Sequence, residues 1–550
     1  MTSGLTKTLG YLAKTENEAA VQLLITALDA PDRTIAQSSL RALLERRSVA
    51  GHREIIHRLH SFDEGWRNIV AEYPARMSQA LRDAVLDADP QVCANGCQAI
   101  LRFREYDLIP TLVKAAENLS DSQSSLVAKT LLELCGLLYE ELASPRDTQK
   151  RRDPQFDRRH ATAALQDSLQ RFAHHKRSEI IECFLLLAGR ENSALMQILS
   201  DPMHPSFVPV AQMLTHGTHP GLIRLVLGHL DNSQTPTALL SVIAHRCDRR
   251  FVEQLLRRIG HTPTASARSN LKRIESIAWL KNGYALLDEL DDAAQYGAVQ
   301  MVIATRMKQA DAYRMIEHLA HHGKPGGRRA AAAALTKFPG AEASQLTLEL
   351  LKDSDPQVQA AALRQLRQRG IPGALPTLLA MVDSQHQVVR QAARESLAEF
   401  SFSRYLHAFD MLEPNVARST GLLVKRIDIQ TLSILRQELQ SSSGKRRMRA
   451  VDIARIIEVV PQIEETLLEL LASPDHLVRA STAAALGDSS TPAALSALNE
   501  ACHDSSLIVQ EAALGALGEI ARRAQAPASQ PAASHSPASR ADAPTDETLS

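Results

Sequence analysis

Residues 353–366 read DSDPQVQAAALRQL, and the same pattern returns at a nearly constant interval through the C-terminal half of the chain. Val358 and Leu366 mark one copy, and Val389 and Leu397 occupy the equivalent positions 31 residues later. Copies begin at positions 327, 358, 389, 416, 448, 478 and 509, with spacings of 27 to 32 residues. A repeat of this length predicts a chain built from stacked supersecondary units.

Each copy predicts a pair of helices joined by a tight turn. The apolar or small residues at offsets 0, +3, +4 and +8 lie on one face of an α-helix. The preceding turn, such as 353–356, is rich in Asp, Ser and Pro, which start a helix and prevent a continuous one. Another apolar run, 346–351 in this copy, comes before the turn. We therefore predict an all-α fold, an α-α superhelix of stacked antiparallel helix hairpins.

These residues resemble the HEAT repeats, and in particular the short variety known from phycobilisome lyases. In that family the turn carries an Asp and the second helix opens with Val-Arg. The matching residues here are Asp353 (or Asp355), Asp383, Asp475 and Asp504 in the turns, and Arg328, Arg390, Arg449 and Arg479 at the helix starts. Gln359, Ala417 and Gln510 depart from the pattern, so a continuous Asp–Arg ladder would be interrupted there. The resemblance implies that these aspartates and arginines are structural.

The pattern divides the chain into five segments. We predict diverged helical repeats over 1–145, a basic polar loop over 146–160, diverged helical repeats over 161–319, regular repeats over 320–523, and a disordered tail rich in Ala, Pro and Ser over 524–550. Fair copies of the repeat begin at Ile35 and Val92, whereas the stretch around Trp66 keeps the helical period but loses the consensus. Partner specificity is predicted where the pattern breaks.

The composition fits a repeat protein and disfavours two kinds of partner. The chain has 550 residues, of which 44% are hydrophobic, and its 62 basic residues balance 62 acidic ones. A neutral balance argues against a dominant nucleic-acid footprint. The sequence has no signal-peptide pattern and no run of about 18 apolar residues, so we predict no membrane insertion and a cytoplasmic location. The six cysteines lack disulfide or zinc spacing, and Cys93 and Cys97 are interpreted as small buried residues.

Few residues have a spacing typical of a catalytic or metal-binding site. His318, His321 and His322 have helical spacing, but a metal site needs a further ligand, and exposed helix-end histidines explain them as well. The glycine-rich turn 323–328 lacks the spacing of a phosphate-binding loop. We therefore assign no catalytic, cofactor-binding or metal-binding residue.

Two basic segments are the candidate contacts for an anion or a partner. The first comprises Lys150, Arg151, Arg152, Arg158 and Arg159, and the second comprises Lys445, Arg446 and Arg447. Clustered basic side chains bind phosphates or acidic proteins. The alternative, a solvated loop and ordinary helix-opening arginines, is favoured by the neutral net charge.

Three classes of function follow from these observations. The first is a non-enzymatic scaffold or adaptor that binds a protein partner of unknown identity on the repeat surface; the resemblance implies this class. The second is a nucleic-acid-associated repeat protein, which requires basic segments and stacking aromatics on one concave face. The third is an enzyme related to the bilin lyases or to HEAT-like DNA glycosylases, which requires a cleft with acidic or thiol residues.

Overall fold

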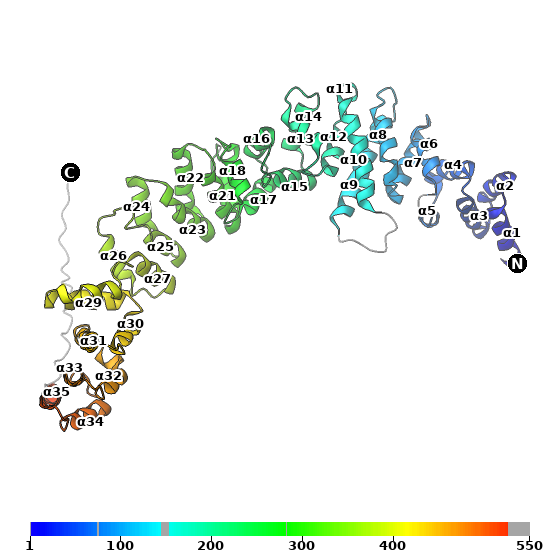
Figure 1. Cartoon of the computed structure of the whole chain (residues 1–550). Helices are drawn as coiled ribbons and strands as arrows, with labels where there is room; N and C mark the ends of the chain where they lie inside the picture. The colour runs from blue at the N-terminus through cyan, green and yellow to red at the C-terminus, as the bar shows by residue number, and fades with distance from the viewer. Residues whose placement is uncertain (1, 74–75, 145–152, 282, 526–550) are drawn as a thin grey trace, which may run out of the picture. The chain divides into compact units, whose positions relative to one another are not determined.

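The computed structural model describes residues 2–73, 76–144, 153–281 and 283–525, and every regular element in these ranges is a helix (Figure 1). The chain divides into two compact units, residues 1–346 and 347–550. The predicted all-α fold is confirmed, and within each unit successive helices stack in chain order as an α-solenoid.

The first unit contains the helices α1 Thr2–Lys14, α2 Ala19–Leu28, α3 Arg33–Arg46, α4 Val49–His57, α5 Glu64–Ala71, α6 Ser78–Val85, α7 Pro90–Phe103, α8 Ile109–Glu117, α9 Ser124–Ala143, α10 Pro154–Gln170, α11 Phe172–His175, α12 Ser178–Leu187, α13 Ser193–Ser200, α14 Phe207–His216, α15 Pro220–His229, α16 Thr237–His245, α17 Arg249–Ile259, α18 Ala265–Leu271, α19 Ala278–Lys281, α20 Ala285–Glu289, α21 Asp292–Ala304, α22 Gln309–His322 and α23 Pro325–Ala334. Three short 3₁₀ helices accompany them: η1 Leu59–Ser61, η2 Tyr106–Leu108 and η3 Leu335–Lys337.

Helix α24 (Ala341–Leu350) spans the boundary. The second unit then contains α25 Pro356–Leu363, α26 Ala374–Met381, α27 Gln387–Ser396, α28 Phe402–Ala408, α29 Pro414–Ile427, α30 Thr431–Leu439, α31 Gly444–Ile456, α32 Glu464–Leu470, α33 His476–Leu486, α34 Pro492–Ala501 and α35 Leu507–Gln525, with 3₁₀ helices η4 Phe409–Met411 and η5 Val460–Gln462.

The Asp-Pro turns start helices as their chemistry predicts. Asp355 caps α25 by accepting a hydrogen bond from the backbone N–H of Gln357, and Pro356 is the first helical residue. Asp89 and Pro90 perform the same two roles at the start of α7. A carboxylate cap satisfies an N–H group that the helix leaves unpaired, and proline fits the first position because it has no N–H to satisfy.

The seven repeat starts fall in α23, α25, α27, α29, α31, α33 and α35, each the helix that follows a turn. In the second unit α25 packs on α27, α31 on α33, and α33 on α35. Val358, Val389, Val478 and Val509 at offset 0 are completely buried. The copy predicted at position 416 fits only at its end: Val416 at offset 0 is 47% exposed, whereas Val424 at offset +8 is buried together with Ala417 and Gly421.

Two predicted segment boundaries change. Residues 154–160 form the first two turns of α10, capped by Asp153, so the predicted loop over 146–160 is too long. At the other end, α35 continues to Gln525, so the first two residues of the predicted tail belong to the helix. The predicted tail from 526 onward lies outside the described residues. The other segment limits stay predictions.

Glycines in the first unit allow unusually close helix packing. A Cβ atom on Gly297 of α21 would lie 2.0 Å from the backbone oxygen of Leu256 in α17. A Cβ on Gly327 of α23 would lie 2.4 Å from the side-chain oxygen of Gln295 in α21. That same oxygen accepts a hydrogen bond from the backbone N–H of Lys324. The glycine-rich sequence over 323–328 therefore serves helix packing.

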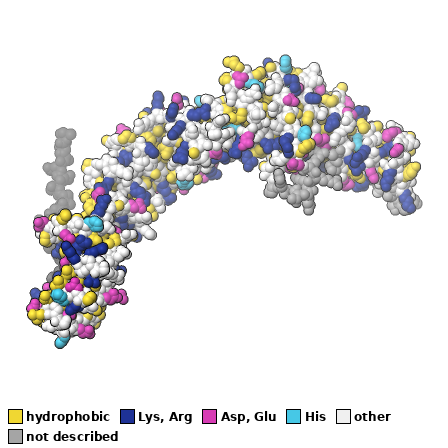
Figure 2. Space-filling model, in the orientation of Figure 1, with side chains coloured by type: hydrophobic (Ala, Val, Ile, Leu, Met, Phe, Trp, Pro, Cys, Tyr) yellow, Lys and Arg dark blue, Asp and Glu magenta, His cyan; other side chains and the backbone are white. Residues whose placement is uncertain are grey.

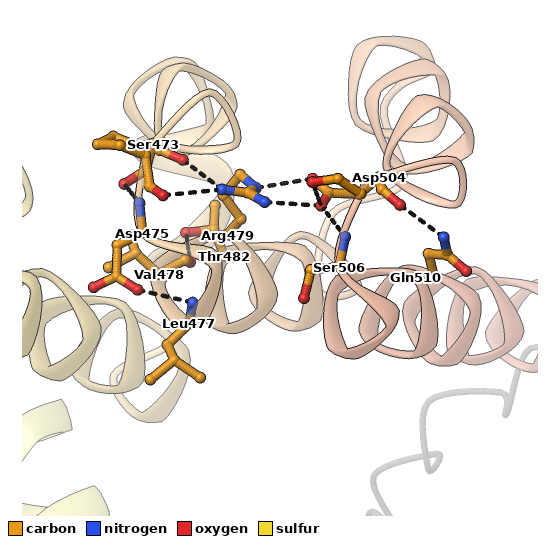
Figure 3. A network of polar contacts seen from close by, with 11 residues as sticks. Ser473, Asp475, Leu477, Val478, Arg479, Thr482, Asp504, Ser506 and Gln510 are labelled. Atoms are coloured by element: carbon orange, nitrogen blue, oxygen red, sulfur yellow. Dashed lines mark hydrogen bonds and ion pairs between the residues drawn. The ribbon is translucent and has the colours of Figure 1, made fainter.

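Three of the four repeat arginines donate to the turns that precede their own helices, as Figure 3 shows for Arg479. Arg479 donates to the carbonyl oxygen of Ser473 at 2.8 Å, and Arg390 donates to that of Ser384 at the same distance. Arg479 also forms a two-armed ion pair with Asp504 in the next turn, with both N–O distances 2.8 Å. These hydrogen bonds lower the pKa of Asp504 to about 2.

The glutamines at this position keep only part of the arrangement. Gln359 donates to the carbonyl oxygen of Asp353, and Gln510 to that of Asp504, both at 2.7 Å and both six residues back. Glutamine therefore retains the bond to its own turn but carries no charge for a neighbouring carboxylate.

The remaining predicted ladder residues follow the same theme with different partners. Arg328 donates to the carbonyl oxygen of Gly323, and Arg449 pairs with Asp410 at 3.3 Å. Asp383 pairs with Arg426, and Asp475 caps α33 by accepting from the N–H of Leu477. The predicted structural residues thus make structural contacts, although Asp–Arg pairing between consecutive repeats is not continuous.

Candidate partner-binding groove

A groove in the first unit lies where α10, α12 and α15 pack beside the C-terminal end of α9. It consists of two adjoining hollows of about 790 Å³ and 330 Å³, which share Gln155, Arg158, Gly189 and Arg190. We call it the basic groove, lined by Tyr139, Gln155, Arg158, Arg159, Arg190, Gly221 and Arg224.

Small residues and apolar packing form the floor of the basic groove. A Cβ atom on Gly221 would lie 2.8 Å from Leu186 and 3.2 Å from the ring of Tyr139, so α15 approaches α12 and α9 closely there. Gly228, about two helical turns further along α15, has open space where a side chain would be. Gly221 therefore serves close packing, and Gly228 is the position that leaves room above the helix backbone.

Arg158 is fixed by the end of α12. Its Nε donates to the carbonyl oxygen of Leu187 at 2.7 Å, and its Nη1 lies 3.4 Å from the side-chain oxygen of Gln155. Carbonyl groups at a helix C-terminus carry partial negative charge and attract a guanidinium. A Cβ atom on Gly189 would lie 2.9 Å from Nη2 of Arg158, so the guanidinium lies directly against this glycine.

The groove carries an excess of positive charge. Its charged lining residues are Arg158, Arg159, Arg190 and Arg224 against Asp153 and Glu191. Asp153 is engaged as the cap of α10, and Glu191 lies 3.7 Å from Arg190. Among the described residues Arg158, Arg159 and Arg224 form no ion pair, so their charge is available to an outside carboxylate or phosphate.

His229 lies behind this lining, completely buried on α15. Burial lowers its pKa, and the positive charge of Arg190 lowers the pKa further. The imidazole is therefore neutral near pH 7, and the charge of the groove comes from its arginines.

The structure tests part of the first predicted basic segment. Arg158 and Arg159 lie in the groove as candidates, whereas Lys150, Arg151 and Arg152 fall outside the described residues. Sequence reasoning missed Arg190 and Arg224. Arg224 did leave a signal, since it is the one residue among Lys, Arg, Asp and Glu in the apolar run 222–230.

The second predicted basic segment lies at the start of α31, and one of its three residues is neutralised by an ion pair. Arg446 forms a two-armed pair with Glu438, and Arg449 pairs with Asp410. The Nε atom of Arg447 is buried, and Lys445 is exposed. Arg446 is thus neutralised by Glu438, whereas Lys445 and Arg447 form no ion pair among the described residues.

The histidine and cysteine candidates have structural surroundings. His318 Nε2 lies 2.7 Å from a carboxylate oxygen of Asp288, and its ring lies 5.0 Å from that of His322. Cys93 and Cys97 are buried free thiols, as interpreted. The described part of the chain contains no group of three His, Cys, Asp or Glu side chains able to hold a metal ion. No helix in that part is long and apolar enough to span a membrane.

Comparison with known proteins identifies the repeats. The family model for HEAT repeats matches residues 313–398, 432–518 and 463–539. A search of the curated proteins finds no match to this chain.

Solved structures give only distant likenesses. A chain from a structure on the phosphorylation-controlled interaction between cadherin and β-catenin is 14% identical, covers 92% of this chain and 99% of its own, and has a TM-score of 0.29. The karyopherin Kap121p bound to the SUMO protease Ulp1p is 12% identical, covers 95% of this chain and 57% of its own, and has a TM-score of 0.25. Human deoxyhypusine hydroxylase in complex with glycerol is 17% identical, covers 57% of this chain and 99% of its own, and has a TM-score of 0.16. With TM-scores this low, none of them informs the function of this chain.

Proposed function

The chain carries HEAT repeats over residues 313–398 and 432–539, and from this premise we propose that it is a non-enzymatic scaffold or adaptor that binds a protein partner on its helical surface. Stacked-repeat proteins present a long surface made of many helices, which suits them to extended protein partners. The free thiols are in keeping with a reducing compartment such as the cytoplasm.

The basic groove is the part of the surface that we assign to the partner. Its arginines without ion pairs, Arg158, Arg159 and Arg224, are the observation that carries the assignment. Guanidinium groups bind carboxylates in two-armed pairs, and the open floor at Gly228 admits a main chain or a small side chain. An acidic segment of the partner is therefore the proposed ligand.

Nucleic acid is the alternative that the arginines raise. The face seen in Figure 2 has Lys and Arg side chains interspersed with Asp and Glu on each unit rather than gathered in a basic stripe. Nucleic-acid sites combine a basic track with exposed aromatic rings, and Tyr139 is the one aromatic residue lining the basic groove. These features favour the protein partner.

Site-directed photo-crosslinking tests the proposal. A benzophenone amino acid at position 228 places the reactive group over the groove floor of the full chain in cells that express it. We expect an adduct with one protein, identified by mass spectrometry, which the double variant Arg159→Glu, Arg224→Glu no longer forms because the groove charge is reversed.

The matched control is Arg250→Glu with Arg268→Glu, which makes the same charge change at exposed arginines of α17 and α18. This control should form the adduct at the level of the unmodified chain. Loss of the adduct in both double variants, or an adduct with nucleic acid alone, would contradict the proposed site.

A further inference from the structure

Helix α35 exposes an apolar stripe to solvent. Leu507, Glu511, Leu514, Gly518 and Arg522 are spaced by three or four residues and so lie on one side of the helix. Leu507 is 67% exposed and Leu514 is 60% exposed. We call these five residues the α35 face. Exposed leucines of this kind, one above the other on a helix, mark an interaction surface when they are grouped.

The α35 face corresponds to the side of α33 that packs on the next repeat. The residues of α33 that lie 31 positions earlier are Ala480, Ala483 and Gly487, all of them buried. A Cβ atom on Gly487 would lie 3.0 Å from Ala516 of α35, so this side of α33 is the side that packs on the next repeat. Their equivalents in α35, Glu511, Leu514 and Gly518, are exposed. The α35 face is thus a stacking surface without a described helix on it.

We propose that a second copy of this chain covers the α35 face, with the two α35 helices antiparallel about a two-fold axis. In that arrangement residues equally distant from residue 516 face each other. Leu514 of one copy then meets Gly518 of the other, and the reverse pair forms by symmetry. A leucine opposite a glycine lets two helices approach closely without a clash.

The charges of the α35 face fit the same arrangement. Glu511 and Arg522 lie five and six residues on opposite sides of residue 516, so each carboxylate comes beside the guanidinium of the other copy. Neither side chain has an ion-pair partner within the described residues. The neighbouring Arg523, by contrast, is bound back to Asp488 at 3.0 Å. Two free opposite charges placed for mutual pairing favour a second copy over an unrelated partner.

Sedimentation velocity on the purified full chain between about 5 and 100 µM tests the proposal, because a single helix pair gives a small interface and weak affinity. We expect a dimer whose fraction rises with concentration. Leu514→Glu should leave a monomer throughout this range. Leu477→Glu is the matched control, since Leu477 is an exposed leucine of α33 at 44%, and it should dimerise like the unmodified chain.

A charge swap identifies the pair itself. Glu511→Arg and Arg522→Glu should each weaken the dimer roughly fivefold or more, and the double variant should restore it to within about twofold, because both new charges face their opposites across the axis. Circular dichroism checks that each variant remains helical.

Three results would overturn the proposal. The first is a monomer at every concentration, and the second is a dimer affinity of the double variant that is lowered as much as by the two single changes combined. The third is a chain ending at Gln525 that dimerises while the full chain does not. The last result would mean that residues 526–550 cover the α35 face.

Discussion

In several repeats one side chain at the start of the helix donates a hydrogen bond to the preceding turn. Arg479 reaches both its own turn and the carboxylate of Asp504, whereas Gln359 and Gln510 reach only their own turns. The natural variation between Arg and Gln within one chain therefore separates two contributions, the bond to the turn carbonyl and the charged pair between repeats.

Substitution of Arg479 should measure these contributions one at a time. Arg479→Ala removes the turn bond and the pair, and should lower the free energy of unfolding by ~2 kcal/mol, since hydrogen bonds to charged groups contribute about 1.5–3 kcal/mol. Arg479→Gln keeps the turn bond, as in two other repeats, and should cost ~1 kcal/mol less than alanine. Urea unfolding followed by circular dichroism measures both values. Equal losses would show that the turn bond contributes nothing.

The same pair makes stability depend on acidity. The hydrogen bonds from Arg479 hold the pKa of Asp504 at about 2 in the folded chain, below the value of about 3.9 for an unfolded aspartate. The carboxylate therefore stabilises the fold above pH ~4, and this stabilisation is lost as the pH falls toward 2. Urea midpoints between pH 6 and pH 2 should fall more steeply for the unmodified chain than for Asp504→Asn. Parallel curves would exclude the pair as the cause.

Sequence reasoning predicted the repeat residues at this scale better than the groove residues. Asp475, Asp504 and Arg479 follow a periodic pattern, so their structural role can be predicted from one chain. Arg190 belongs to no period, and its place beside Arg158 depends on how α10 packs against α12. A contact between helices that are far apart in the sequence leaves no spacing to recognise.

At the scale of the helix, close packing depends on a few residues without side chains. Helices α17 and α21 touch at Gly297, where a methyl group would overlap the backbone of Leu256. Backbone atoms cannot rotate away as a side chain can, so the helices themselves must separate.

Gly297→Ala should therefore destabilise the chain by about 2 kcal/mol or more through overpacking. The control is Gly136→Ala in α9, where a Cβ atom meets nothing within 4 Å. That change should be neutral or stabilise by up to ~1 kcal/mol, because alanine favours the helix over glycine. Thermal unfolding of the two variants compares them directly, and similar shifts in both would contradict the packing explanation.

The helices themselves were predictable because their apolar period and their Asp-Pro turns are local properties. The charged side chains of segment 154–160 favour a loop, yet Asp153 caps a helix there and Pro154 fits its first position. The register of α29 differs from the prediction because the small residues Ala417 and Gly421 are buried beside Val424 and Ile427, while Val416 is exposed. Small residues carry a weak hydrophobic signal even when they are buried.

At the scale of the whole molecule, each hairpin is stabilised mainly by its neighbours in the stack. Contacts run from α17 to α21, from α21 to α23, from α31 to α33 and from α33 to α35. In a chain of nearest-neighbour contacts, the effect of a local defect decays along the stack.

Hydrogen exchange on Gly297→Ala should show this decay. Amides of α17 and α21 should lose protection, while those of α33 and α35 in the other compact unit should exchange as in the unmodified chain. Peptide-resolved mass spectrometry of both chains under native conditions gives the comparison. Uniform loss of protection in both units would mean that the chain unfolds as one cooperative body.

The periodic stacking surface also bears on how such a chain changes length over generations. Because α33 and α35 carry equivalent positions 31 residues apart, an in-frame duplication of that stretch would insert one helix-hairpin repeat whose two packing sides already match its neighbours. Duplication or loss of one repeat alters the length of the helical stack without requiring a new core. The number of repeats can thus be matched to the length of the partner surface that the protein must contact.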